Sequence, residues 1–157
     1  MPVGDLVVRG PAFAYGYFDR PDATRDAFLP GQWFRTGDQA SVDEHGWLSL
    51  SGRTKDIIIR GGENIPVTDV ESVIFDHPDV VNAALVGLPD ERLGERICAV
   101  LVVKDGRPEL TVGSLAEYLV AAGLSKHYLP ECVVTLPELP TTPSGKIQKF
   151  KLREMIG

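Results

Sequence analysis

Two apolar runs that lie close together in the chain restrict the possible folds more than any other feature of this sequence. They are "VVNAALVGL" at 80–88 and "ERICAVLVV" at 95–103, and the polar segment "PDERLG" separates them. Both runs are much shorter than the ~18 apolar residues needed to span a bilayer. Continuous Val-, Ile- and Leu-rich runs of this length, bounded by polar residues, are typical of strands buried on both faces. The sequence therefore predicts two buried strands.

A helical pattern precedes the first of these strands. In "VTDVESVIFDH", at 67–77, the apolar residues recur at the i, i+3, i+4 spacing of one helix face. Thr68 and Glu71 have the spacing of a capping box, in which each side chain bonds the backbone N–H of the other. Pro78 follows and would end the helix.

Further elements complete the region after residue 53. "TVGSLAEYLVAAG" at 111–123 predicts a helix with Thr111 as a possible N-cap and Gly123 as its stop. Short strands are predicted in "DIIIR" and "ECVVTL", and a last short helix in "IQKFKLREMI". The order strand, helix, strand, strand, helix, strand, helix predicts a compact α+β domain, with a short sheet covered by helices.

The first fifty residues have a different character. "GDLVVRG", "QWFRTGDQASV" and "GWLSLSGR" are strand-like, and "DEHG" between the last two has hairpin-turn chemistry. Long apolar stretches are few, which is unusual for a self-sufficient domain. We therefore divide the chain into a β-rich segment at 1–53, expected to be the remnant of a larger domain, and a C-terminal domain at 54–157.

Composition and charge exclude several classes of function. The formal net charge of -6 argues against binding to nucleic acid or to an anionic membrane, because both require a basic surface. The first residues lack the pattern of a secretory signal, so we expect a cytoplasmic protein without a transmembrane segment. Cys98 and Cys132 lie in apolar runs without metal-ligand spacing and are expected to be buried, reduced thiols. No metal site is predicted.

Three short motifs combine turn-forming residues with a reactive or flexible group. In "RTGD", Asp38 could accept both hydroxyls of a ribose, although an aspartate that closes a hairpin turn gives the same sequence. Gly61–Gly62 would let the backbone approach a ligand, or would simply form a glycine-rich hairpin. In "TTPSGK", Lys146 could carry a point charge into a partner site, or could be one exposed lysine of a basic tail.

Together, these motifs closely resemble the C-terminal third of the adenylate-forming enzymes. This superfamily includes acyl-CoA synthetases, aryl-CoA ligases, luciferases and nonribosomal-peptide adenylation domains. The resemblance covers nearly the whole chain and rests on "GDLVVRGPAFAYGYFDRPDAT", "WFRTGDQASVDEHGWLSLSGRTKDIIIRGGENI", "VESVIFDHPDVVNAALVGLPDERLGE" and "PTTPSGKIQKFKLRE". The "GGENI" and "SGKIQK" variants are most similar to the acyl- or aryl-CoA ligase branch.

This resemblance implies an enzyme that joins a carboxylic acid to coenzyme A and uses ATP. The acid attacks ATP to give an acyl-adenylate and pyrophosphate, coenzyme A then displaces AMP, and the C-terminal domain rotates between the two steps. Asp38 matches the aspartate that holds both ribose hydroxyls of ATP or AMP. Arg53 matches the arginine that contacts the nucleotide at the domain junction, and Lys55 matches the hinge position.

The resemblance also implies roles for two later motifs. Gly61, Gly62 and Glu63 match the loop that lines the pantetheine tunnel after rotation. Lys146 matches the catalytic lysine of the adenylation step.

Other parts of such an enzyme have no counterpart in this sequence, namely the phosphate loop, the acyl pocket and the acid that helps to hold Mg²⁺. We therefore expect magnesium to be held mainly by the missing N-terminal domain, which would be this chain's partner. The chain by itself is expected to be inactive, as a fragment or as the product of a shortened reading frame. A non-catalytic lid-like domain that binds nucleotide or a partner protein is the alternative, and a ribose- or phosphate-binding module of unrelated fold is a third.

Overall fold

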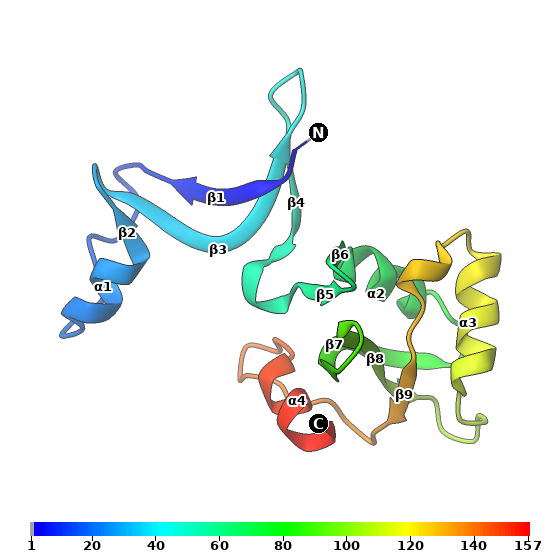
Figure 1. The fold of residues 1–157 in the computed structure, drawn as a ribbon. Helices are drawn as coiled ribbons and strands as arrows, with labels where there is room; N and C mark the ends of the chain where they lie inside the picture. Colours follow the sequence, from blue (N-terminus) through cyan, green and yellow to red (C-terminus); the bar gives the residue numbers. More distant parts are fainter. Residues whose placement is uncertain (1) are drawn as a thin grey trace. The chain divides into compact units, whose positions relative to one another are not determined.

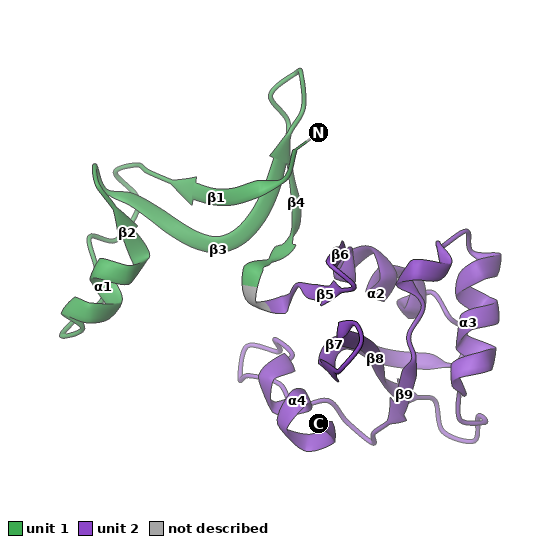
Figure 2. Ribbon diagram, viewed as in Figure 1, with its two compact units in different colours: residues 1–55 green, residues 56–157 purple. Residues whose placement is uncertain are grey.

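The computed structural model describes residues 2–54 and 56–157 of the chain. It divides into two compact units, residues 1–55 (unit 1) and 56–157 (unit 2), coloured separately in Figure 2. The division lies close to the expected boundary after residue 53. Each unit has a sheet of its own. That unit 1 is the remnant of a larger domain stays a prediction.

Unit 1 is organised around one long central strand. Its elements are β1 (Gly4–Val8), α1 (Pro21–Ala27), β2 (Phe28–Leu29), β3 (Trp33–Val42) and β4 (Leu48–Arg53). β1 pairs antiparallel with one edge of β3, and β2 and β4 pair antiparallel with the other edge. The predicted hairpin turn between β3 and β4 is confirmed. There, the Asp43 carboxylate accepts hydrogen bonds from the backbone N–H groups of His45 and Trp47, at 2.9 and 2.8 Å.

Unit 1 buries very little apolar surface. Within residues 2–54, Ala40 is the one buried apolar residue, at 9% exposure. Large aromatic side chains are exposed instead, and the exposed fraction reaches 99% for Phe18 and 74% for Trp47. This agrees with the shortage of long apolar stretches in this part of the sequence. Backbone pairing, rather than a packed core, is the main interaction that holds the strands of unit 1 together.

Unit 2 is the mixed α+β fold that the sequence predicts. Its elements are β5 (Ile58–Arg60), β6 (Glu63–Ile65), α2 (Val67–Phe75), β7 (Val80–Asp90), β8 (Gly94–Val103), α3 (Val112–Ala121), a 3-10 turn (Lys126–Tyr128), β9 (Cys132–Thr135) and α4 (Lys149–Ile156). The predicted order is confirmed, with β6 as one additional short strand.

The two buried strands pair with each other. β7 and β8 form an antiparallel ladder from Val80↔Val103 to Asp90↔Gly94, and β9 pairs parallel with β8. In Figure 1, α2 and α3 lie on one side of this sheet and α4 lies on the other. Unit 2 is therefore a sheet between two helical layers.

Alternate residues of β8 belong to two separate cores. Ile97, Ala99 and Leu101 pack in the core with residues of α2 and α3. Cys98 and Val100 pack in the opposite core with Leu152 of α4. All five of these β8 residues are completely buried, as expected for a strand covered on both faces.

The two cysteines are free, and they differ in burial. Cys98 is completely buried, as expected, and burial raises the pKa of its thiol. Cys132, its register partner on β9, is only half-buried, so the expectation of a buried thiol is wrong for this residue. Because β9 pairs with β8 alone, its residues are less completely covered.

The capping box predicted at Thr68 and Glu71 is wrong. The helix α2 begins two residues earlier than this box requires, with Pro66 in place of Thr68 as the N-cap residue, and Pro66 makes no side-chain cap. Glu71 instead accepts a hydrogen bond from the backbone N–H of Leu85 on β7, at 2.7 Å. Glu71 therefore bonds β7, which is distant in the sequence, and not the backbone N–H of Thr68 in its own helix.

The N-cap predicted for the second helix is confirmed. Thr111 Oγ1 accepts from the backbone N–H of Ser114 at 3.1 Å, and Ser114 Oγ accepts from the Thr111 N–H at 3.0 Å. The predicted stop is also confirmed, because Gly123 follows the helix with φ +91°.

We predict that the amides of unit 1 exchange with solvent faster than those of unit 2. The β3 amides are held by hydrogen bonds over a poorly covered sheet, whereas the β8 amides lie between two apolar cores. Native-state hydrogen exchange of the 157-residue chain should give protection factors roughly 100-fold lower for β3 than for β8. Equal protection of the two strands in a monomer would contradict this prediction.

Candidate functional site

Asp38 and Arg53 are brought together by the pairing of β3 with β4. They are direct partners in this antiparallel ladder, and Arg53 Nε donates to Asp38 Oδ1 at 3.0 Å. The Asp38 side chain is 26% exposed and the Arg53 side chain 52%. Within the described part of unit 1, Oδ1 is the only carboxylate oxygen of Asp38 that has a partner. Among the described residues of unit 1, no contact occupies the second oxygen of Asp38 or the outer guanidinium nitrogens of Arg53.

A bend before Asp38 fixes the direction of its carboxylate. Thr36 Oγ1 accepts from the backbone N–H of Asp38 and donates to the carbonyl of Leu6, both at 3.0 Å. Gly37, between them, has φ +77°, which favours glycine. The motif "RTGD" thus lies inside a strand rather than in the hairpin turn that was its alternative.

The arrangement of Asp38 and Arg53 has a clear chemical capacity. A carboxylate oxygen that is already oriented by a guanidinium leaves a second oxygen to accept hydroxyl hydrogens. The remaining guanidinium N–H groups can donate to a phosphate or another anion. A sugar that carries neighbouring hydroxyls and a phosphate fits this combination.

Gly61 and Gly62 form the two-residue turn of the β5–β6 hairpin. Arg60 and Glu63 pair on either side of the turn, and the glycines have φ +59° and φ +85°. Positive φ at both central residues is the requirement of the type I′ hairpin turn. A Cβ at Gly62 would meet no atom within 4 Å, so the backbone conformation and not crowding requires glycine there. Glu63 is exposed beside the turn.

A second turn supports the glycine turn from the β7–β8 hairpin. Gly61 N–H donates to the Leu93 carbonyl at 2.8 Å. Leu93 is itself held by Asp90, whose Oδ1 accepts from the N–H groups of Leu93 and Arg92 at 2.9 and 3.0 Å. These two hydrogen bonds lower the pKa of the Asp90 carboxyl. Asp90 was not among the predicted site residues, although the "PDERLG" segment contains an aspartate of the kind that begins such a turn.

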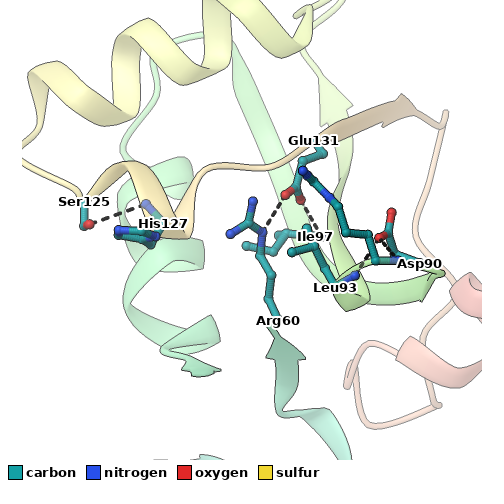
Figure 3. A network of polar contacts seen from close by, with 8 residues as sticks. Arg60, Asp90, Leu93, Ile97, Ser125, His127 and Glu131 are labelled. Atoms are coloured by element: carbon teal, nitrogen blue, oxygen red, sulfur yellow. Dashed lines mark hydrogen bonds and ion pairs between the residues drawn. The ribbon is translucent and has the colours of Figure 1, made fainter. Parts of the chain in front are cut away.

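An ion pair beside the glycine turn links it to β9. Figure 3 shows Arg60 and Glu131 pointing toward each other, with Arg60 Nε 2.5 Å from Glu131 Oε1. The other oxygen of Glu131 accepts from the backbone N–H of Ile97 at 2.8 Å. Sequence reasoning missed this pair, because no motif connects two residues that lie 71 positions apart.

Lys146 is exposed at a tight turn, as predicted. Thr142 N–H donates to the Lys146 carbonyl and Gly145 N–H donates to the Thr142 carbonyl, both at 2.8 Å. The Thr142 hydroxyl also accepts from the Lys146 N–H at 3.1 Å. Gly145 has φ +81°, and an isolated bridge pairs Thr141 with Ile147. Residues 141–147 are named the lysine turn below.

The lysine turn is anchored at both ends. Leu139 before it and Leu152 after it are buried in the core beneath α4. Gln148 N–H donates to the Pro140 carbonyl at 2.8 Å and closes the base of the turn. The turn therefore holds an exposed, charged side chain at a fixed place in the fold. The alternative from the sequence, one exposed lysine of a basic tail, agrees equally with the exposure of Lys146.

Three further expectations concern the hinge residue, metal binding and membrane-spanning helices. Lys55, expected at the hinge, lies outside the described residues. Within residues 2–54 and 56–157, no group of three or more His, Cys, Asp or Glu side chains is placed to hold a metal ion. Over the same residues, no helix is long and apolar enough to cross a membrane.

Comparisons with known proteins converge on one family. Residues 69–146 match the model of the AMP-binding enzyme C-terminal domain. The medium-chain fatty-acid–CoA ligase of Escherichia coli is 42% identical over 98% of this chain, and this chain covers 27% of its length. The 2-hydroxy-7-methoxy-5-methyl-1-naphthoate–CoA ligase of Streptomyces carzinostaticus is 44% identical, with the same two coverages of 98% and 27%.

A solved structure agrees with these relatives. ATP-bound MatB from Rhodopseudomonas palustris superimposes with a TM-score of 0.87 at 34% identity, over 98% of this chain and 30% of that one. The chain thus spans little more than a quarter of the length of the curated relatives that it matches.

We predict that Gly62→Ala destabilises unit 2 by about 1–2 kcal/mol, because an L-residue in the left-handed region carries this cost. Gly62→Asn should cost less, since asparagine tolerates that region. Urea unfolding of the 157-residue chain, followed by the circular dichroism of unit 2, measures both changes.

Gly113→Ala is the matched control for this prediction. Gly113 lies in α3, and a Cβ there would make only an ordinary contact, at 3.8 Å from Thr111 Oγ1. This substitution should stabilise by about 0.5–1 kcal/mol. If Gly62→Ala lowered the free energy of unfolding no more than Gly113→Ala, the assignment of a left-handed turn to residues 61 and 62 would be wrong.

Proposed function

We propose that this chain, whose residues 69–146 match the AMP-binding enzyme C-terminal domain, is the C-terminal part of an ATP-dependent acyl- or aryl-CoA synthetase. The overall reaction converts a carboxylic acid, ATP and coenzyme A into acyl-CoA, AMP and pyrophosphate. One observation carries the proposal, namely the exposed Lys146 on a turn that is anchored at both ends. The ligase activities of the two relatives support it.

Lys146 is the proposed catalytic residue of the adenylation step. When a carboxylate attacks the α-phosphate of ATP, two anions meet and negative charge builds up on the phosphoryl oxygens. An ammonium group between them offsets this repulsion and fixes the direction of attack. A compact charge on a flexible stem, held by a rigid turn, suits this task.

Asp38 and Arg53 are the proposed nucleotide-binding residues. The carboxylate of Asp38 would accept both hydroxyls of the ribose in ATP or AMP. Arg53 would orient this carboxylate through the 3.0 Å contact and would direct its outer N–H groups to the nucleotide. The residues present therefore fit a nucleotide substrate.

Gly61, Gly62 and Glu63 are the proposed coenzyme A loop. A turn without side chains lets the pantetheine arm pass close to the backbone. Lys55 is proposed as the hinge about which the C-terminal domain rotates between the two half-reactions. Mg²⁺ would be held mainly by the N-terminal adenylation domain, as the resemblance to the adenylate-forming enzymes implies.

We predict that Lys146→Ala, in a full-length ligase that contains this chain, slows adenylation by about 10²–10³-fold. Thioester formation from supplied acyl-adenylate should change little, because the rotated domain would carry Lys146 away. Pyrophosphate exchange measures the first step, and acyl-CoA release from the purified adenylate measures the second.

Two controls accompany the Lys146 experiment. Lys146→Arg should restore activity only in part, because a planar guanidinium does not replace a compact ammonium. Lys151→Ala removes an exposed lysine of α4 and should leave both steps unchanged. A defect shared equally by the two steps, or confined to the second, would refute the role of Lys146.

We also predict that the 157-residue chain alone catalyses neither pyrophosphate exchange nor acyl-CoA formation. The sequence contains no phosphate loop and no acyl pocket. Exchange above background, with ATP, magnesium and a panel of carboxylic acids, would disprove this. Binding of AMP without turnover, together with an active Lys146→Ala ligase, would instead favour the alternative of a non-catalytic lid-like domain.

A further inference from the structure

We infer that Glu71 and Lys149 are positioning residues for Lys146, acting through an ion pair that fixes the base of the lysine turn. The inference rests on the proposed function of Lys146. It assigns to the reaction two residues that do not touch the reacting atoms.

The ion pair is short and well covered. Lys149 Nζ lies 2.7 Å from Glu71 Oε1, and the two side chains are only 14% and 17% exposed. The same oxygen of Glu71 accepts from the backbone N–H of Leu85 at 2.7 Å. One carboxylate oxygen therefore connects α2, β7 and the start of α4.

The chain between this pair and Lys146 is short and has little freedom. Lys149 is the first residue of α4 and follows Lys146 by three positions. Ile147 packs against the core beneath α4 and is bridged to Thr141. Gln148 is held through the Pro140 carbonyl at 2.8 Å. A shift of Lys149 must therefore move the lysine turn as well.

Stability alone is a poor explanation for this pair. A lysine at the first residue of a helix is opposed by the positive end of the helix dipole. A mostly buried ion pair must also offset the loss of water around two charges, and an apolar pair of similar size is often as stable. The ion pair instead fixes a position, because its charged hydrogen bond holds α4 at one place relative to α2.

The first test measures both half-reactions in the full-length ligase. Lys149→Met and Glu71→Gln should each slow adenylation by about 10–100-fold, since a displacement of about 1 Å costs on the order of 100-fold. Thioester formation from supplied acyl-adenylate should change by less than about twofold. Glu71→Gln keeps an acceptor for the Leu85 N–H and removes only the charge. Lys149→Arg should restore most of the adenylation rate.

Lys151→Met is the matched control, because Lys151 is an exposed lysine of the same helix. It should leave both half-reactions unchanged. The double variant Glu71→Gln/Lys149→Met should be no slower in adenylation than either single variant, because the two residues act as one unit. It also keeps the test valid if a single unpaired charge impairs folding.

The second test separates this inference from the proposed function. In the 157-residue chain, nuclear magnetic resonance should show that Lys149→Met shifts the amide signals of Thr142, Gly145 and Lys146 and raises their hydrogen exchange. The amides of Leu101 and Leu119, in the opposite core, should keep their protection.

Distinct results would overturn the two ideas. An unchanged lysine turn in Lys149→Met, an equal loss in both half-reactions, or an equal effect of Lys151→Met would each overturn the positioning role. A Lys146→Ala ligase that still forms adenylate would overturn the proposed function, whatever the turn amides show.

Discussion

The antiparallel pairing of β7 with β8 is the interaction on which the rest of unit 2 depends. Because alternate residues of β8 enter two different cores, the register of this ladder decides what packs under α2 and α3 and what packs under α4. A slip by one residue would exchange the two sets of core residues.

The pairing of β7 with β8 also brings Gly94 opposite Asp90, and the turn between them supplies the Leu93 carbonyl that supports Gly61. It also presents the Leu85 N–H to Glu71. The exposed turns thus depend on a ladder that is itself buried.

Much of this architecture can be predicted from the sequence, because strong local patterns decide it. The two apolar runs predict β7 and β8, and Thr111 predicts the start of α3, since a hydroxyl cap needs only the next turn of chain. Asp38 and Arg53 were both predicted to be site residues. The structure makes them direct strand partners, which their spacing in the sequence does not reveal. The exposed turn under Lys146 was also predictable, because Pro143 and Gly145 leave few other conformations.

The errors and omissions have a common physical cause, namely contacts between residues far apart in the chain. Glu71 has the spacing of a capping box, yet its carboxylate bonds Leu85 and Lys149 instead, and a local pattern cannot weigh those partners. The strand β6 was missed because "ENI" gains its pairing only after the glycine turn reverses the chain. The Arg60–Glu131 pair had no sequence signal at all. Such contacts appear only when the fold is known.

The two proposed functional turns are supported by the same kind of device. Glu131 pairs with Arg60 at the edge of the glycine turn and also accepts the Ile97 N–H of β8. Glu71 pairs with Lys149 at the base of the lysine turn and also accepts the Leu85 N–H of β7. In each case a carboxylate bound to a strand amide of the central sheet holds a cation next to an exposed turn. The ladder fixes the position of the strand amide, and the hydrogen bond to this amide fixes the carboxylate. The carboxylate in turn holds the cation, and with it the adjacent turn, at one place. Apolar packing alone would leave such small turns poorly oriented, because it has no preferred direction. Two charged hydrogen bonds supply the direction, and the buried ladder supplies the rigidity.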